Sequence, residues 1–368
     1  MGSSKLTLSL LLFLLLVLAG SCTGTRSMNV IDRCWRRNPN WAANRERLAV
    51  CSLGFAGKMR RNIGKGLTWY TVTNPGDDPV RPRPGTLRYG ATVLPGKVWI
   101  TFAHDMQIRL QQPLAVKSFT TIDGRGANVQ IAYGAGFLLY QVMCIILVSD
   151  VIIHGLQFHN IRSTAGDGDA IRLVGSRRVW LDHNTLYASQ DGLVDVSRGS
   201  TAVTVSNNWF RDHDKVMLLG HDDGYLADRR MRVTVAFNRF GPNCNQRMPR
   251  IRHGYAHVVN NLYDGWGSYA IGGSMGPRVK SQANLFVASN SSNKKVTSRI
   301  AGNGEGESWN WRSVNDAFAN GAFFRQSGHG RVRPGYNRQQ QFPVGSARAV
   351  RALTRDAGAL WCSTRTRC

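Results

Sequence analysis

A segment of about eight residues recurs along the middle of the chain, and this repeat constrains the fold more than any other feature. Apolar and polar residues alternate within each copy, which is typical of β-strands. Six copies begin at Val151, Val179, Val203, Val233, Ala256 and Val279. Successive copies therefore start 23 to 30 residues apart, a period that is typical of stacked supersecondary units.

The segments between these copies narrow the choice of repeat architecture. No amphipathic helical pattern lies between them, which argues against a fold of alternating strands and helices. A propeller blade needs roughly 40 residues, and a leucine-rich repeat needs regular leucine spacing. Five copies carry an asparagine at the equivalent place, which predicts a ladder of stacked amides: Asn184, Asn208, Asn238, Asn261 and Asn284. The sequence therefore predicts an all-β single domain, a right-handed parallel β-helix.

A second set of short apolar segments follows the first, and it carries a concentration of acidic residues. The four are Asp167, Asp169, Asp191 and Asp195. Asp167, Asp191 and Lys215 are each 24 residues apart, so they are expected to stack at about 4.8 Å per coil. Arg247 falls near the same column one coil later.

Strand periodicity predicts which way the acidic side chains point. Side chains alternate between the two faces of a strand, so Asp191, Leu193 and Asp195 should share one face, opposite Val194. If Val194 points into the core, both carboxylates point outward. The same alternation pairs Asp167 with the acid two residues later, which predicts a four-carboxylate patch on the outer wall.

Carboxylates this close repel one another unless a cation lies between them. Hard oxygen ligands of this kind suit Ca²⁺, which accepts an irregular shell and can leave positions open for a substrate. The competing interpretation is that some of these aspartates cap turns, since Asp-Gly is a common turn pair. For Asp167 alone the turn is the better interpretation, whereas the four together favour a metal.

The start of the chain predicts its compartment. Lys5 precedes an apolar run over residues 6–18 and then small residues, which is typical of a cleaved secretory signal, here residues 1–24. The run is shorter than the roughly 20 residues that span a bilayer. Asn290 begins an Asn-Ser-Ser glycosylation sequon, which agrees with the secretory route. We therefore expect a secreted, extracellular protein with no membrane attachment after cleavage.

The cysteines and the limits of the repeat suggest how the mature chain is organised. Cys34 with Cys51, and Cys362 with Cys368, are close enough in sequence for two local disulfides, whereas Cys144 and Cys244 are either paired or simply buried. We expect an N-terminal segment over 25–90 that packs on the helix, a β-helix core with the active site over 91–290, and a C-terminal covering segment over 291–368.

Several long motifs resemble those of one family. They include "DGDAIRLV", "WLDHNTL", "QDGLVDV", "TVSNNWF", "HDKVMLLGHDD", "NQRMPRIRHGYAHVVNNLY" and "YAIGGS", in this order, and outside the core "TTIDGRG", "WNWRSVNDAFANGAFF" and "DAGALWC". The chain resembles the plant pectate lyases of polysaccharide lyase family 1 over nearly its whole mature length. That family folds as a right-handed parallel β-helix, which agrees with the repeat pattern.

The resemblance implies roles for individual residues. The family's calcium ligands match Asp167, Asp169, Asp191 and Asp195. Its catalytic base matches Arg247, and its substrate-binding cations match Lys215 and Arg252. The implied activity is Ca²⁺-dependent β-elimination on polygalacturonate, which cuts the α-1,4 linkage without water and leaves a 4,5-unsaturated sugar.

A guanidinium is an unusual base, because its pKa lies above about 12. Crowding by Ca²⁺ and neighbouring cations would have to lower that of Arg247, so we expect an alkaline activity optimum. Lys215 and Arg252 would bind the substrate carboxylate. The planar guanidinium of arginine is well suited to paired contacts with a carboxylate. Without the resemblance, the competing and weaker interpretation of either residue is solvated basic surface.

The charge balance points to a polyanionic partner. The chain has 47 Lys and Arg against 22 Asp and Glu, a net charge of +25. Such a balance can indicate nucleic-acid binding, but a secreted plant-wall protein meets pectate instead. Arg60-Arg61 and residues 331–338 are candidate patches or solvated loops. We expect binding to demethylated pectin, no nucleic acid, and a monomer.

Two other functions are compatible with parts of this pattern. A polygalacturonase shares the architecture and the substrate, but a hydrolase needs a carboxylic acid of raised pKa facing the glycosidic oxygen, and the Lys215, Arg247 and Arg252 set suits elimination better. The other is a catalytically weak pectate-binding wall protein on the same scaffold. The connection "HNIRSTAGDGDA" is shorter than in many relatives, which puts the shape of the cleft in doubt and leaves the acids in place.

Overall fold

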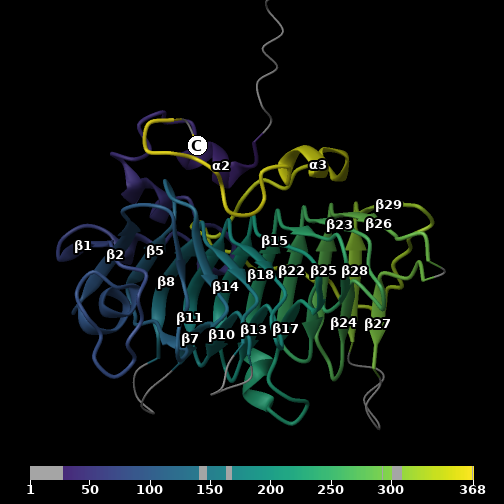
Figure 1. The fold of residues 1–368 in the computed structure, drawn as a ribbon. Helices are drawn as coiled ribbons and strands as arrows, with labels where there is room; N and C mark the ends of the chain where they lie inside the picture. The colour runs from purple at the N-terminus through teal and green to yellow at the C-terminus, as the bar shows by residue number, and fades with distance from the viewer. Residues whose placement is uncertain (1–27, 141–146, 163–167, 292, 301–308, 367) are drawn as a thin grey trace, which may run out of the picture.

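Three parallel sheets run the length of the molecule, and successive coils of the chain contribute strands to them in turn (Figure 1). The computed structural model describes residues 28–140, 147–162, 168–291, 293–300, 309–366 and 368. Every strand pair in the three sheets is parallel and joins neighbouring coils, as between Val179 and Val203. The predicted right-handed parallel β-helix is confirmed.

The strands are short, as expected for a β-helix. The first sheet contains β1 (Leu67–Val72), β2 (Lys97–Phe102), β5 (Thr120–Asp123), β8 (Ser149–His154), β11 (Arg177–Asp182), β14 (Thr201–Ser206), β18 (Arg232–Ala236), β22 (Tyr255–Val259), β25 (Arg278–Gln282) and β28 (Asn310–Val314). The second contains β3 (Met106–Ile108), β6 (Val129–Ala132), β9 (Gln157–His159), β12 (Thr185–Tyr187), β15 (Trp209–Phe210), β19 (Arg239–Phe240), β23 (Leu262–Asp264), β26 (Leu285–Val287) and β29 (Ala317–Ala319).

The third sheet carries the candidate site. It contains β4 (Leu114–Ala115), β7 (Phe137–Tyr140), β10 (Ile171–Val174), β13 (Val194–Ser197), β17 (Met217–Leu219), β21 (Arg250–Ile251), β24 (Ile271–Gly273) and β27 (Thr297–Arg299). A two-stranded ladder beside it pairs β16 (His213–Lys215) with β20 (Cys244–Gln246). The helical turns are α2 (Val30–Trp35), η1 (Arg45–Val50), η2 (Gly54–Ala56), η3 (Arg60–Asn62), η4 (Tyr89–Val93), η5 (Leu226–Arg230), η6 (Ala347–Ala349) and α3 (Val350–Leu353).

Stacked identical side chains hold the coils in register. Val179, Val203 and Val233 lie next to one another on adjacent strands and are fully buried. The predicted asparagine ladder is confirmed, because each amide donates to the next along the stack, as from Asn184 Nδ2 to Asn208 Oδ1 at 3.1 Å. This stacking satisfies buried polar groups and fixes the register of the turns.

The sheets extend beyond the predicted core of 91–290 at both ends, from Leu67 to Ala319. The end coils lack the repeated motif from which the limits were drawn. At the C-terminal end the asparagine ladder ends on Asp316, whose carboxylate accepts hydrogen bonds from the backbone N–H and the amide of Asn284. A change of residue type therefore hid one coil from the sequence pattern.

The two terminal segments lie side by side along one edge of the β-helix, purple and yellow in Figure 1, and cover the outer face of the first sheet. Trp35 and Trp41 from the N-terminal segment pack with Trp99 and Trp180 from the sheet. Trp41 Nε1 donates to the carbonyl of Thr366 at 3.0 Å. The outer face of the first sheet is thus converted into a second hydrophobic layer.

The cysteine pairing agrees with the sequence. Disulfides join Cys34 to Cys51 and Cys362 to Cys368, one in each terminal segment. Cys244 is a buried free thiol among the described residues, and burial raises its pKa to about 12. Cys144 and the predicted signal segment, residues 1–24, lie outside the described residues. None of the helices described is long and apolar enough to cross a membrane.

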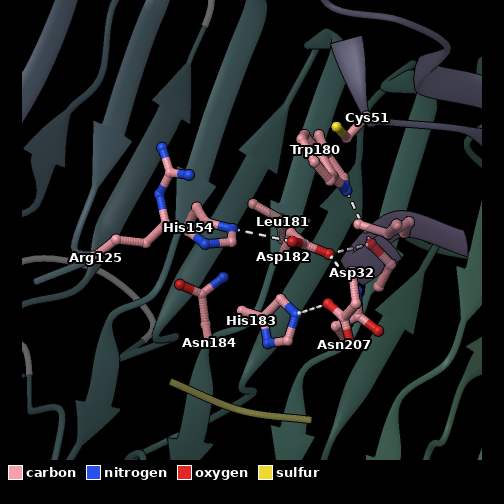
Figure 2. A network of polar contacts seen from close by, with 12 residues as sticks. Asp32, Cys51, Arg125, His154, Trp180, Leu181, Asp182, His183, Asn184 and Asn207 are labelled. Carbon is pink, nitrogen blue, oxygen red and sulfur yellow. Dashed lines mark hydrogen bonds and ion pairs between the residues drawn. The ribbon is translucent and has the colours of Figure 1, made fainter. Parts of the chain in front are cut away.

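A network of charged and polar side chains is buried beneath the terminal segments (Figure 2). His154 Nδ1 lies 2.9 Å from the carboxylate of Asp182, and His183 Nε2 lies 2.7 Å from that of Asp32 in α2. Ser206 Oγ donates to Asp182 at 2.6 Å and accepts from the indole of Trp180. These groups are almost completely buried, so each needs the partners it has.

Candidate active site

The predicted site residues that the structure describes lie at the outer face of the third sheet, away from the terminal segments. Arg172, Asp195, Leu218 and Arg250 occupy equivalent positions on β10, β13, β17 and β21. Each is partly exposed, whereas the residues before and after it on its strand are buried or nearly so. Strand alternation therefore places this column outward, with the core on the other side.

Asp169 and Asp195 approach each other over a glycine. The backbone N–H of Gly192 donates to Asp169 Oδ1 at 2.8 Å. A Cβ added at Gly192 would lie 2.6 Å from Asp195 Oδ1 and 2.8 Å from Asp169 Oδ1. Any side chain at this position would displace a carboxylate, so the absence of a Cβ keeps two acidic oxygens directed at the same place.

The carboxyl of Asp195 is poorly compensated. Burial and repulsion from Asp169 and Asp191 raise the pKa of Asp195 well above its ordinary value, while Arg172 and Arg247 oppose the shift only in part. A carboxyl in such surroundings stays ionised only if a further cation joins it. The cluster therefore favours cation binding on electrostatic grounds.

Asp191 and Lys215 form the pair that the 24-residue spacing predicted. Lys215 Nζ lies 3.0 Å from Asp191 Oδ1, and both side chains are about 40% exposed, at 41% and 39%. His213 Nε2 lies 2.6 Å from the backbone carbonyl of Asp191, and burial lowers the pKa of this histidine. The ladder of β16 and β20 thus holds Lys215 beside the acids.

The predicted facing of residues 191–195 was wrong in one respect. Leu193 is completely buried in the core and does not share a face with Asp195. The strand begins only at Val194, so Asp191 and Leu193 lie in the preceding turn, where alternation does not apply. Asp191 reaches the outer face from that turn.

Arg247 lies between β20 and β21, in a left-handed backbone conformation with φ of 62°. Its carbonyl accepts a hydrogen bond from the Met217 N–H at 2.6 Å, which fixes this turn to the third sheet. Among the described residues, its buried Nε has no hydrogen-bond partner. The guanidinium is thus held near Asp195 by its backbone and keeps donor capacity for a ligand.

Arg252 is held by the loop that projects below β13 and β17 in Figure 1, which includes η5. Its Nε lies 3.3 Å from the carboxylate of Asp223, and its Nη1 donates to the carbonyl of Gly220 at 3.0 Å. Burial, together with Arg250 and Arg247, lowers the pKa of Arg252. Three guanidinium groups are therefore close enough to repel one another.

The acidic cluster fits Ca²⁺ by its chemistry. Its donors are carboxylate oxygens, two of which meet over Gly192, and their mutual repulsion calls for a cation. Within the ranges that the structure describes, no three His, Cys, Asp or Glu side chains already converge with metal-ligand spacing. The fourth predicted ligand, Asp167, lies outside the described residues.

Sequence reasoning missed three residues of this face. Arg172 lies 3.9 Å from Asp169 and next to Asp195 on the adjacent strand. Arg250 occupies the same column, and the ring of Tyr269 covers Gly272 beside it. The sequence does contain a signal for two of them, because Arg172 and Arg250 take the outward position of strands that the repeat predicts. Neither residue stands out by its charge, because the whole chain is strongly basic.

The glycosylation sequon lies elsewhere on the surface. Asn290 is exposed and accepts a hydrogen bond from the Asn320 amide at 3.0 Å. It lines a hollow of about 780 Å³ with Trp266 and Asn245, and none of the predicted site residues lines this hollow. The third sequon residue, at position 292, lies outside the described residues.

Comparison with known proteins gives consistent results. A family model described as pectate lyase matches residues 103–328. Pectate lyase 1 of Cryptomeria japonica is 47% identical over 369 residues, which cover 95% of this chain and 96% of that protein. A pectate lyase of Zinnia elegans is 47% identical over 359 residues, 92% of this chain and 87% of that protein. The crystal structure of jun a 1, the major allergen from cedar pollen, superposes with a TM-score of 0.83 at 44% identity, covering 90% of this chain and all of that one.

Proposed function

The chain belongs to the pectate lyase family, and from this premise we propose that it cleaves α-1,4-linked polygalacturonate by Ca²⁺-assisted β-elimination. The observation that carries the proposal is the incompletely compensated acidic cluster on the open face, with Lys215 and Arg247 beside it. An acidic site can hold an anionic polymer only if cations reverse the charge of the site. This face has both the acidic residues and the cationic side chains that such binding requires.

Asp169, Asp191 and Asp195, with Asp167 from outside the described residues, would hold the calcium ion. When bound, Ca²⁺ neutralises the uronate carboxylate and so stabilises negative charge that develops beside C5. The same charge removes the repulsion that raises the pKa of Asp195. The four aspartates thus serve as a counter-charge for the ion and do not act as acids or bases.

The cations of the face would act on the substrate directly. Arg252, oriented by Asp223 and Gly220, would bind a uronate carboxylate with its planar fork. Lys215, which is held beside Asp191, would share that role. Arg247 would remove the C5 proton, after which the C4–O bond breaks, the electron pair forms the C4–C5 double bond, and the leaving oxygen takes a proton from solvent.

A general base of this kind makes an alkaline optimum the expected pH profile. Rising pH enlarges the small neutral fraction of a guanidinium. Crowding among arginines is present on this face, as the lowered pKa of Arg252 illustrates. We propose that Arg247 is the base because it matches the family's catalytic arginine, its backbone is fixed by Met217, and its buried Nε has no partner among the described residues.

The proposed setting is the plant cell wall, reached after removal of residues 1–24. Exposed arginines support binding to an anionic wall polymer. Arg177, Arg232 and Arg278 are the first residues of β11, β18 and β25, which are every second strand in that part of the first sheet, and each is exposed. Their spacing of about 9.6 Å, two strand steps, would present positive charge along the helix axis.

The direct test is the ultraviolet absorbance of the unsaturated product. The secreted protein is incubated with polygalacturonate and calcium, then with a chelator, and reducing ends are counted in parallel. Absorbance that requires calcium supports the lyase. Reducing ends without absorbance indicate a hydrolase, and neither signal indicates the alternative of a catalytically weak pectate-binding protein.

The role of Arg247 is tested with a matched pair of substitutions. Arg247→Lys keeps the charge but changes the base, so turnover should fall by about 10²–10⁴, the usual contribution of a general base. Arg239→Lys is the control, because Arg239 pairs with Asp264 on the second sheet, outside the site. Near-normal turnover of Arg247→Lys would remove this arginine as the base.

A further inference from the structure

We propose that a protonated His183 fastens the N-terminal and C-terminal segments to the β-helix, so that one proton sets how firmly both are held. His183 follows β11 directly and has a left-handed backbone conformation, with φ of 52°. This conformation turns its side chain outward beneath the terminal segments, as Figure 2 shows. The ring is completely buried there.

Both ring nitrogens of His183 face oxygen acceptors. Nε2 lies 2.7 Å from Oδ1 of Asp32, in the N-terminal segment. Nδ1 lies 3.0 Å from the carbonyl oxygen of Gly358, in the C-terminal segment. A carbonyl can only accept, so Nδ1 carries a hydrogen. The ring is neutral only if Asp32 carries the proton on the other side.

The partners of Asp32 place the proton on the histidine. Arg36 Nη1 lies 3.1 Å from Oδ2 of Asp32, and the amide of Asn29 donates to the same oxygen. Burial opposes ionisation, but His183 and Arg36 outweigh it and lower the pKa of Asp32. Asp32 is therefore a carboxylate, and His183 is an imidazolium that donates from both nitrogens.

The charges around the ring support the same assignment. Asp182 lies one residue before His183 and Asp356 pairs with Arg36, while Arg125 lies beyond His154. His154 donates from Nδ1 to Asp182, and its Nε2 has no partner among the described residues. Burial lowers the pKa of His154, which is therefore neutral. His183 is the one histidine of this network that carries charge.

The imidazolium joins three parts of the chain that are far apart in sequence. Asp32 lies in α2, two residues from the disulfide-bonded Cys34. Gly358 lies four residues before Cys362, whose disulfide closes the C-terminal segment. The N–H of Gly358 also donates to the carbonyl of Asn207 on the helix. Loss of the proton would remove one donor from the network and leave Asp32 or Gly358 without its partner.

The sign of the pH dependence follows from the shift. Burial opposes the charge on His183, but Asp32 and Asp182 outweigh it and raise its pKa above the ordinary value of 6.5. A raised native pKa means that the contribution is complete below about pH 6.5 and is lost as pH rises through the native value. Both terminal segments should therefore loosen together at alkaline pH.

The test measures the protonation state of His183 and the hydrogen-exchange protection of the two terminal segments in separate experiments. Nitrogen NMR of histidine-labelled wild-type protein should show one doubly protonated ring that titrates above 6.5. Hydrogen exchange, corrected for its intrinsic pH dependence, should show residues 28–36 and 355–366 losing protection together over that titration. Each unit of raised pKa corresponds to about tenfold in this linkage, so the size of the loss should match the pKa that the NMR titration gives for His183.

His183→Gln and His154→Gln serve as a matched pair. The first should lose the alkaline change in exchange, because it has no proton to release, whereas the second should keep it. A neutral His183 ring at pH 6 overturns the proposal even if neither variant folds. Segments that lose protection at different pH values, or only with global unfolding, overturn it as well.

Discussion

Two clusters of carboxylates lie on outer faces of the same β-helix, and they differ in how their charge is compensated. Beneath the terminal segments, Asp123 contacts Arg45 and Arg125 at 2.8 and 2.7 Å, and Asp32 contacts Arg36 and His183. On the third sheet, three aspartates share the face around Gly192, and the cations there are partly exposed or held by other groups.

The pKa shifts record this difference. Burial opposes ionisation in the covered cluster, yet the adjacent cations lower the pKa values of Asp32 and Asp123. In the open cluster burial and repulsion raise that of Asp195. Carboxylates whose charge is compensated by neighbouring cations stabilise the fold. Carboxylates whose charge is not fully compensated are available to bind a metal ion and, through it, a substrate.

The largest effect is expected from charge removal in the open cluster. Asp195→Asn removes a proposed calcium ligand, so lyase activity should fall by about 10²–10³, as for loss of a major electrostatic group. Its thermal stability without calcium should not fall, because the substitution also removes repulsion from Asp169 and Asp191. Activity assays and chelator-treated melting curves check both parts, and a clear loss of stability would contradict the comparison.

Charge removal in the covered cluster should have the opposite effect, lowering stability and leaving activity nearly unchanged. Asp182→Asn keeps the shape but leaves His154 without its charged partner and weakens the bonds from Ser206 and Asn207. Losing hydrogen bonds to a buried charged group costs about 1.5–3 kcal/mol for each bond. Urea unfolding measures this cost, and turnover per folded molecule should stay within about twofold because the site is on another sheet. A selective loss of turnover would show that the clusters are coupled.

The two clusters should also respond to acid with opposite signs. Asp195 has a raised native pKa, so without calcium it stabilises the fold at low pH and loses that contribution as pH rises above about 3.8. Asp32 has a lowered native pKa, so its contribution is present above about 3.8 and is lost as pH falls. Urea unfolding in chelator between about pH 4 and 7 separates them. Asp195→Asn should reduce the loss of unfolding free energy at rising pH by about 1.4 kcal/mol per unit of pKa shift. Asp32→Asn should leave that loss unchanged.

The repeat predicted most of the fold because stacking requires equivalent residues at equivalent positions. The asparagine ladder could be read from Asn184 to Asn284, but its last member is Asp316, which breaks the pattern while filling the same place. Segments packing on the β-helix at both ends of the chain were expected from the sequence, but the face that they cover could not be predicted. It depends on contacts such as Arg36 with Asp356, 320 residues apart, which leave no local signal.

The candidate site was predicted in its chemistry and less well in its geometry. Spacing predicted the contact of Lys215 with Asp191 because both lie at equivalent places in successive coils. It misplaced Leu193, because alternation was extended into a turn. Pairing between strands, which sequence alone does not give at single-residue precision, is what brings Arg172 beside Asp195.

The smallest effect concerns charge that belongs to neither cluster. Arg177, Arg232 and Arg278 form an exposed row at the starts of β11, β18 and β25. Changing all three to Gln should weaken binding to polygalacturonate several-fold at low salt, at about 0.2–1 kcal/mol for each exposed charge. The difference should shrink as salt screens the surface, while turnover at saturating substrate stays unchanged. Lys65, Arg348 and Arg351 are also exposed and lie in other segments, so their triple Gln variant controls for net charge. Equal weakening of both variants would mean that the polymer responds to total charge and not to this row, because only these three arginines begin every second strand along one edge of the first sheet.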